Sequence, residues 1–174
     1  MPTPEPESSV ARAATRNRFA DHEPISAATA GSASLLTQTL RIYLEDTDAG
    51  GIVYHASWLR FFERARTDWL RALGIEQSSL GPATGIGFVV RDMRIAFLRP
   101  GRLDQAIRTE LRLAEARRAS LLLTQNAFDT ASGEELVRAT VRIAALRLTD
   151  QRAAPLPRTL LAGLATRGAL ATET

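Results

Sequence analysis

The fold of this chain is decided by one stretch, DTDAGGIVYHASWLRFFERARTDWLRALG, which spans residues 46–74. Its second part places large apolar side chains, including Trp58 and Trp69, at helical spacing. We expect Ser57 to be the N-cap of this helix, because a serine hydroxyl can accept a hydrogen bond from a free amide of the first turn. Gly74 is expected to end it, because glycine readily adopts the left-handed conformation found after many helices.

Strands are expected on both sides of this helix. Residues 39–46 alternate and carry β-branched or aromatic residues, as a strand does. A loop rich in Gly, Ser and Pro is expected over residues 74–87. The later expected elements are strands at 87–100, 106–114, 120–129 and 135–148 and a short helix within 155–169. One sheet and one apolar helix indicate an α+β domain in which the sheet wraps the helix.

The chain has 174 residues and is 45% hydrophobic, which suits one globular domain with a substantial core. We place this domain at residues 37–170. Residues 1–36 are rich in Pro, Glu, Ser, Ala and Arg and are expected to form a disordered tail, because such a segment buries too little apolar surface to offset the entropy of ordering.

The charge and cysteine content exclude several classes of site. All 22 basic residues are arginine, so the high isoelectric point by itself does not indicate nucleic-acid binding, although arginine suits phosphate groups. The absence of cysteine excludes disulfides and thiolate catalysis. The sequence has no apolar run long enough to span a bilayer and no secretory signal pattern, so we expect a cytoplasmic protein.

The segment DTDAGG, residues 46–51, allows several interpretations. A calcium loop of the EF-hand type that starts at Asp46 would need glutamate at its twelfth position, where Ser57 stands. One histidine and two acids are too few ligands for a zinc or iron site, so no metal is expected. The Gly-x-Ser-x-Gly motif of serine hydrolases does not occur.

Two interpretations of this segment remain. In the simpler one, an aspartate bonds the backbone of a polar turn. In the other, a carboxylate lies just before a helix N-terminus, whose free amides and positive dipole can stabilise an oxyanion. That pairing suits thioester hydrolysis, because a thiolate leaves readily and little acid assistance is needed.

The residues YLEDTDAGGIVYHASWLRFFERARTDWLRALG, 43–74, resemble the signature of hotdog-fold thioesterases of the 4-hydroxybenzoyl-CoA thioesterase family. They are most similar to the acyl-CoA thioesterase branch encoded beside the Tol–Pal cell-envelope genes of Gram-negative bacteria. The resemblance extends through GFVVRDMRIAFLRPGRLD, SLLLTQ and PLPRTL to about Leu160. It implies a hotdog fold, in which a curved antiparallel sheet wraps a long central helix.

The resemblance also assigns roles to residues near the helix start. Asp48 matches the family's catalytic carboxylate, as general base or as nucleophile. His55 is the second catalytic candidate, and the backbone amides near His55 and Ala56 would polarise the thioester carbonyl. Tyr54 and Trp58 are expected either to line the acyl pocket or to pack in the core.

Further candidates lie elsewhere in the chain. Arg117, Arg118 and Ser120 match the turn at which relatives meet the phosphates of coenzyme A, and the alternative is a solvated turn. Arg91 lies on the strand that passes the pantetheine arm in relatives. Glu63 and Arg66 are expected to form an ion pair at i, i+3, although other hotdog branches place a catalytic acid on this helix.

The expected substrate is a thioester of coenzyme A or acyl carrier protein, with no cofactor and no nucleic acid. Family precedent implies a homotetramer, a dimer of dimers with each site shared between two chains. Two other functions stay open at this point. One is a hotdog dehydratase or hydratase, and the other is a non-catalytic module that binds acyl carrier protein or an envelope complex.

Overall fold

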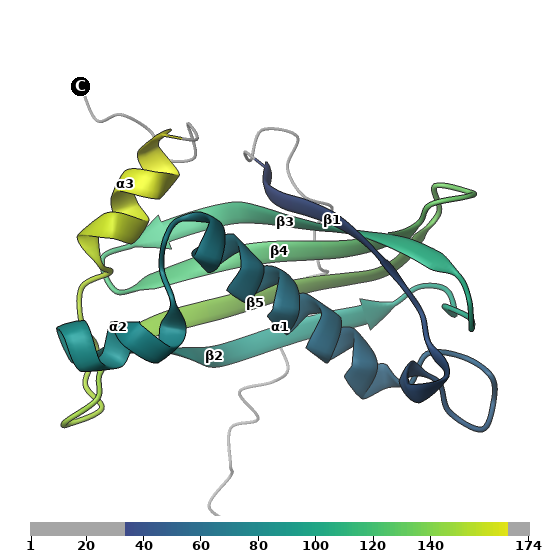
Figure 1. Cartoon of the computed structure of the whole chain (residues 1–174), viewed down its shortest axis with the longest axis horizontal. Coiled ribbons are helices and arrows are strands. Elements are labelled where there is room, and N and C mark those ends of the chain that lie inside the picture. The colour runs from purple at the N-terminus through teal and green to yellow at the C-terminus, as the bar shows by residue number, and fades with distance from the viewer. Residues whose placement is uncertain (1–33, 167–174) are drawn as a thin grey trace, which may run out of the picture.

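The computed structural model describes residues 34–166, which form one antiparallel sheet and three helices (Figure 1). The strands follow the order β1-β3-β4-β5-β2 across the sheet, so β1 and β2 are its edges. The helix α1 lies across one face of the sheet, and α2 and α3 lie near the C-terminal end of α1. The bounds of these elements are β1 Ser34–Arg41, α1 His55–Ala72, α2 Gln77–Thr84, β2 Ile86–Phe97, β3 Ala106–Arg117, β4 Ser120–Asp129, β5 Glu135–Arg147 and α3 Arg158–Thr166. The expected α+β hotdog architecture is confirmed.

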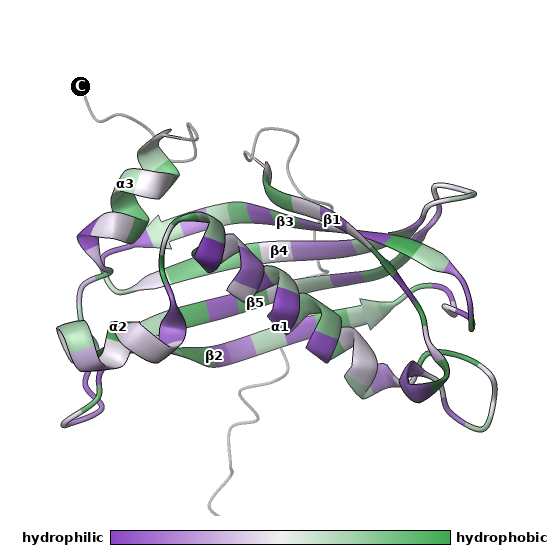
Figure 2. Cartoon of the chain, viewed as in Figure 1, coloured by the Kyte–Doolittle hydropathy of each residue, from purple (hydrophilic) through white to green (hydrophobic). Residues whose placement is uncertain are grey.

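Irregular pairing bends the sheet around α1. The register shifts between Val90 and Asp92 where β2 pairs with β5, and between Leu113 and Glu115 where β3 pairs with β4. An extra residue in one strand bends that strand and increases its twist. The sheet can therefore curve far enough to cover the broad apolar side of α1, while hydrophilic residues mark the other side of the helix (Figure 2).

The core consists of two hydrophobic clusters. One gathers Trp58, Phe61 and Phe62, from the first half of α1, against residues of β3, β4 and β5. The other gathers Trp69 and Leu70, from the second half of the helix, against the sheet, α2 and α3. The first cluster also receives Ile95 near the end of β2, whereas the second receives Ile86 and Phe88 near its start. The helix and β2 therefore run in opposite directions along the core.

The helix ends as expected and starts earlier than expected. Gly74 has φ +75°, and the amides of Gly74 and Ile75 donate to the carbonyls of Arg71 and Leu70. This double hydrogen bond is the Schellman arrangement. At the other end, the N-cap is Tyr54, without any side-chain cap, and Ser57 already lies within the helix. The prediction of Ser57 as N-cap was wrong, because the Tyr54 amide donates to the Asp46 carbonyl (2.8 Å) and starts the helix at His55.

The first strand is shifted relative to the prediction. It begins at Ser34 and ends at Arg41, so residues 42–46, expected to be strand, are not. The buried Asp46 carboxylate accepts a hydrogen bond from the Tyr43 amide (3.0 Å) and folds residues 44–46 into a 3-10 turn. A side chain that bonds the backbone three residues away competes with strand pairing.

The segment expected to be a loop, residues 74–87, contains α2. Its glycine, serine and proline residues have low helix propensity, which favoured the loop prediction. The buried side chain of Leu80 joins the second core cluster, and the left-handed Gly85 closes the helix with a hydrogen bond from its amide to the Gly81 carbonyl (2.8 Å). Tertiary packing therefore outweighs local propensity here.

The outer face of the sheet is polar. Arg108 and Arg112 of β3 both pair with Glu110, and Arg138 of β5 pairs with Glu135. These charged residues alternate with buried apolar ones along the strands, as in a sheet with a single covered face. The tail expected at residues 1–36 lies outside the described residues as far as residue 33, and residues 34–36 belong to β1.

Candidate active site

The loop before α1 is a tight hairpin that holds the two aspartates in different environments. Thr47 pairs with Val53, the Asp48 amide donates to the Ile52 carbonyl (2.9 Å), and Gly51 takes a positive φ of 71°. Glycine is favoured where the chain must adopt that left-handed conformation. Backbone hydrogen bonds within the motif therefore hold the loop, and the loop positions both aspartates.

Asp46 is the structural member of the pair. Its side chain is buried, with 4% of the residue exposed, and bonds the Tyr43 amide, while its carbonyl receives the Tyr54 amide. Asp48 is exposed, and its Oδ1 accepts a hydrogen bond from the Gly50 amide (2.8 Å). This turn hydrogen bond is the one expected from the simpler interpretation of the motif. It leaves Oδ2 of Asp48 without a partner among residues 34–166, so one carboxylate oxygen is available to solvent or substrate.

The N-terminus of α1 has free donors. No side chain caps it, and its first turn contains no acidic residue. The Ser57 amide donates to the Tyr54 carbonyl (2.8 Å), whereas the amides of His55 and Ala56 have no acceptor within the described part of the chain. Unpaired amides at the positive end of an 18-residue helix are suited to a developing negative charge. Asp48 and these amides belong to one continuous segment.

The aromatic neighbours of this segment divide between surface and core. Tyr54 and His55 are both exposed, and their rings lie 4.3 Å apart between centroids at a tilt of 54°. Trp58 is buried, contacts Phe61 edge-on and packs closely against Gly101. Of the two roles expected for Trp58, the structure therefore shows core packing.

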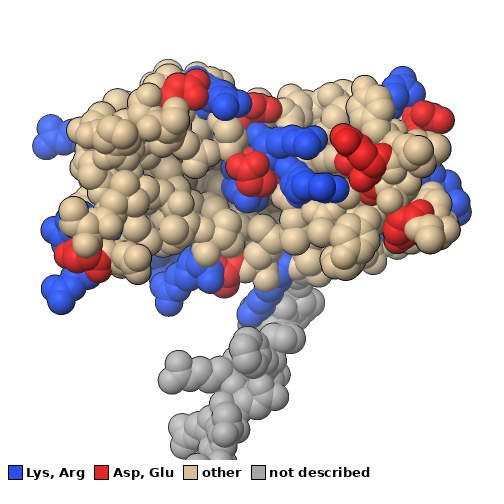
Figure 3. Space-filling view, turned by 60° about the horizontal axis from the view of Figure 1, so that its bottom comes forward, with Lys and Arg blue, Asp and Glu red and all other residues tan. Residues whose placement is uncertain are grey.

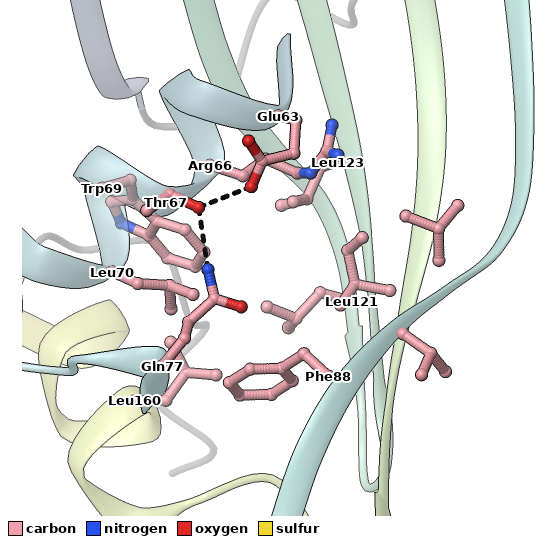
Figure 4. A pocket seen from close by; sticks show the side chains of 13 residues that line it. Glu63, Arg66, Thr67, Trp69, Leu70, Gln77, Phe88, Leu121, Leu123 and Leu160 are labelled. Atoms are coloured by element: carbon pink, nitrogen blue, oxygen red, sulfur yellow. Dashed lines mark hydrogen bonds between the residues drawn. The ribbon is translucent and has the colours of Figure 1, made fainter. Parts of the chain in front are cut away.

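A cavity of about 200 Å³ opens between the second half of α1 and the sheet. Leu121, Leu123 and Phe88 lie on one side, facing Leu70 and Leu160 (Figure 4). Gln77, at the start of α2, donates to the Thr67 hydroxyl on α1, and that hydroxyl donates to Glu63 one turn earlier, each at 2.7 Å. Figure 3, which brings the β2 side forward, shows arginine and acidic side chains beside a hollow in the surface. No pattern in the sequence predicts this cavity, because residues from six different elements line it.

Arg66 forms part of the cavity wall and crosses the core. Its Nη1 donates to Oε1 of Gln125 on β4 (2.7 Å), and Nε2 of Gln125 donates to the Phe62 carbonyl (2.9 Å). The expected ion pair with Glu63 does not form, because Arg66 turns toward the sheet and Glu63 toward the surface. Burial lowers the pKa of the Arg66 guanidinium, and the charge of Glu63 opposes that shift.

The cavity and the Asp48 loop of one chain lie far apart. His55 and Thr67 are separated by twelve helical residues, or about 18 Å along the axis at 1.5 Å per residue. Even from Glu63, the lining residue of α1 nearest to His55, about 12 Å of helix remain, so a ligand must extend well beyond the cavity to place a reacting carbonyl beside Asp48 of the same molecule.

The remaining candidate residues lie elsewhere on the surface. Arg117 pairs with Glu115 at the turn between β3 and β4, and Arg118 is exposed and has no ion-pair partner in the described range 34–166. Ser120 starts β4 and is half-buried, and Arg91 is exposed at the β2 bulge. The structure does not bring these residues together with Asp48 within one chain.

The described residues show neither a metal-binding cluster nor a membrane-spanning helix. Residues 34–166 contain no group of three or more histidine or acidic side chains placed to hold a metal ion. In the same range, no helix has both the length and the apolar character needed to cross a membrane.

Comparison with known proteins defines the family. The sequence profile of the thioesterase-like superfamily matches residues 42–164. The chain belongs to the thioesterase-like superfamily. It is similar to the acyl-CoA thioesterase YbgC of Haemophilus influenzae, with 37% identity over 68% of this chain and 86% of that relative. It is also similar to the acyl-CoA thioester hydrolase YbgC of Escherichia coli, with 36% identity over 74% of this chain and 95% of that relative.

Solved structures of this superfamily show the same fold. A probable thioesterase from Bartonella henselae is 33% identical and superposes with a TM-score of 0.65, covering 70% of this chain and 98% of that one. A 1,4-dihydroxy-2-naphthoyl-CoA thioesterase from Synechocystis reaches a TM-score of 0.71 at 21% identity, covering 78% of this chain and 96% of that one, which supports the fold alone. The superfamily profile thus covers the elements from α1 into α3.

Proposed function

We propose that the chain hydrolyses acyl thioesters of coenzyme A, or of acyl carrier protein, to a free acid and a thiol. The observation that carries this proposal is the position of Asp48 on a rigid hairpin that leads directly into the uncapped start of α1. The similarity to two acyl-CoA thioesterases of the same superfamily supports the same chemistry.

The reaction needs few protein groups. As general base, Asp48 takes a proton from water while the water oxygen attacks the carbonyl carbon, and the His55 and Ala56 amides stabilise the oxyanion. The C–S bond then breaks, and the thiolate leaves and takes up a proton. As nucleophile, Asp48 would instead form a mixed anhydride that water hydrolyses. His55 is the candidate for assisting proton transfer, because it is exposed at the start of α1 and an imidazole has one nitrogen that donates and one that accepts a hydrogen bond.

A second copy of the chain completes the site in this proposal. The edge strand β2 has twelve residues, pairs with β5 and with no other strand among residues 34–166, and exposes Val89, Val90 and Phe97. A long apolar edge favours pairing with another strand. Because α1 and β2 run in opposite directions, antiparallel pairing of β2 with its copy would bring the Asp48 loop of one chain beside the cavity of the other. Such a dimer overcomes the separation of about 18 Å along α1.

Other features extend the proposal. Arg117, Arg118 and Ser120 would meet the phosphates of coenzyme A, because arginine suits phosphate oxygens, and Arg91 would lie near the pantetheine arm. Two dimers would form a homotetramer in the cytoplasm. A role beside the Tol–Pal machinery belongs to this proposal only through the resemblance of residues 43–74 to that branch of the family.

The test is thiol release from a panel of acyl-CoA thioesters by the wild type and by an Asp48→Asn variant. Hydrolysis of at least one thioester by the wild type, lost in the variant, supports the proposal. No hydrolysis by the wild type, or near-normal activity in Asp48→Asn, would contradict it. A panel member converted to an enoyl product would indicate a dehydratase instead.

The dimer has its own test. The wild type is expected to sediment as a multiple of the 18.9 kDa chain, and Val90→Glu to shift toward the monomer, because a carboxylate at a buried apolar edge is costly. Thiol release should fall together with association. A fully active monomer would refute the shared site.

A further inference from the structure

The cavity beside α1 is apolar except for one strip, and its buried charge is positive. Arg66 is 9% exposed and has five N–H donors, of which one bonds the neutral Gln125. The other donors have no acceptor among residues 34–166, and no carboxylate lies within 4 Å of the guanidinium in that range. A buried cation without a carboxylate partner is unusual, because burial of a charge is costly unless it is paired.

Glu63 does not neutralise this charge. It is exposed at the rim of the cavity, and its carboxylate accepts the hydrogen bond of Thr67. Water screens an exposed carboxylate, whereas the guanidinium faces the interior. A ligand in the cavity therefore meets the Arg66 guanidinium beside the apolar surfaces of Leu121, Leu123 and Phe88, with Glu63 at the rim.

The size of the cavity limits what it can hold. It measures about 200 Å³. For comparison, an apolar protein cavity of about 150 Å³ holds one benzene molecule, which has six non-hydrogen atoms. By that scale the cavity holds an acyl group of roughly eight non-hydrogen atoms.

We propose that this cavity receives the acyl group of the substrate and that Arg66 selects short acyl groups ending in a carboxylate. This inference rests on the proposed hydrolysis and on the shared site, and it adds the class of acyl group. The methylene carbons lie against the leucines, and the terminal carboxylate accepts two N–H groups of the guanidinium fork. A guanidinium and a carboxylate match geometrically in this way, and their charge-assisted hydrogen bonds are stronger than neutral ones.

The preference for a terminal carboxylate follows from what an uncharged acyl group would do in the cavity. An alkyl chain of the same length would leave the Arg66 donors buried without an acceptor, and sites with buried polar groups strongly disfavour ligands that cannot pair with them. Arg66 would thus be a specificity-determining residue that contacts the substrate away from the reacting carbonyl.

The decisive experiment compares glutaryl-CoA with pentanoyl-CoA, which have acyl chains of five carbons and differ in the terminal carboxylate. For the wild type we expect kcat/KM to be at least tenfold higher for glutaryl-CoA. For Arg66→Met we expect the order to reverse, because a flexible apolar side chain then meets the terminal group. Equal or higher kcat/KM of the wild type with pentanoyl-CoA would overturn the inference, and this comparison needs no variant.

The matched control is Gln125→Leu, which removes the same buried hydrogen bond but keeps the cation. Its stability should fall while its preference for glutaryl-CoA persists. If Arg66→Met and Gln125→Leu lose activity toward both substrates in the same proportion, Arg66 has only a structural role and the inference fails. In either of these outcomes the wild type still hydrolyses pentanoyl-CoA or glutaryl-CoA, so the inference about Arg66 fails while the proposed thioester hydrolysis stands. If the wild type hydrolyses neither of these substrates and no other acyl-CoA, the proposed function itself is overturned.

Discussion

Arg66 and Gln125 join the central helix to the sheet through a hydrogen bond of 2.7 Å between Nη1 and Oε1. Gln125 is fully buried and also holds the Phe62 carbonyl, so one amide side chain contacts α1 twice. This polar contact lies between the two hydrophobic clusters of the core, one around Trp58 and the other around Trp69. It adds a directional contact between helix and sheet to the apolar packing, which has no preferred direction.

Substitution of Gln125 by leucine should therefore be costly. The change leaves the buried Arg66 guanidinium without its acceptor, and we expect the free energy of unfolding to fall by about 2 kcal/mol. Urea denaturation measures the loss. Gln77→Leu, at an exposed glutamine, is the control and should stay within about 0.5 kcal/mol of the wild type. Equal stability of the Gln125 variant and the wild type would contradict the anchoring role.

The two aspartates of the hairpin should separate function from stability. Asp48→Asn keeps an oxygen for the Gly50 amide but loses the base, so kcat/KM should fall by about 10²- to 10⁴-fold with an unchanged melting temperature. Asp46→Ala removes the buried acceptor of the Tyr43 amide and should lower the free energy of unfolding by about 1–3 kcal/mol. Thiol release and thermal melting of both variants test the division. The reverse pattern would assign the catalytic role to Asp46.

Gly101 should not tolerate a side chain. A Cβ at this position would lie 2.8 Å from Cζ2 of Trp58 and 3.0 Å from Cγ2 of Val53, closer than packed carbon atoms allow. Gly101→Ala is expected to lower the free energy of unfolding by about 1–3 kcal/mol, since both neighbours belong to the tightly packed core. Adding Trp58→Phe should relieve part of the clash. If alanine is neutral in urea denaturation, the packing around Trp58 is looser than described.

Glu135 should make the free energy of unfolding depend on pH in the acidic range. The hydrogen bond from Arg138, helped by one from Asn126, lowers the pKa of Glu135 from its ordinary value of 4.5. The folded state therefore binds fewer protons than the unfolded state, so this contribution is present above about pH 4.5 and is lost as the pH falls through the folded pKa. Glu135→Gln should flatten the decline of unfolding free energy between about pH 5 and pH 3. A decline as steep as that of the wild type would show that Glu135 contributes little.

The arginines of the β3–β4 turn should differ in substrate binding. Arg117 is already paired with Glu115, whereas Arg118 is exposed and free of ion pairs within the described residues. If Arg118 meets the phosphates of coenzyme A, Arg118→Ala should raise KM about fivefold with little change in kcat, as expected for an exposed charge contact. Steady-state kinetics in low and high salt would show the effect shrinking with salt. Arg117→Ala is the paired comparison and should raise KM less, because Glu115 already offsets the charge of Arg117. An equal rise in KM in both variants would argue against a larger contribution by Arg118.

The sequence predicted most of the fold because its signals are local. The alternation of β3 and the helical spacing of α1 follow from which face of each element is buried, and Gly74 ends the helix because it can adopt a positive φ. The strand over residues 42–46 and the loop at 74–87 were predicted wrongly for a different reason. There, the buried Asp46 carboxylate and the buried Leu80 side chain override local propensity, and burial is a property of the whole fold.

The candidate site divides in the same way. The sequence by itself determined that a glycine turn, a carboxylate and the start of the helix lie side by side, because Asp48, Gly51 and His55 lie within eight residues of one another. That the helix starts at His55 without a side-chain cap was decided by the structure. Only the tertiary structure decided that Asp46 is buried and Asp48 exposed, that Arg66 bonds Gln125 instead of Glu63, and that a cavity opens beside α1. These features depend on side chains that are far apart along the chain and meet only when the sheet closes around the helix. No local pattern of residues encodes such meetings.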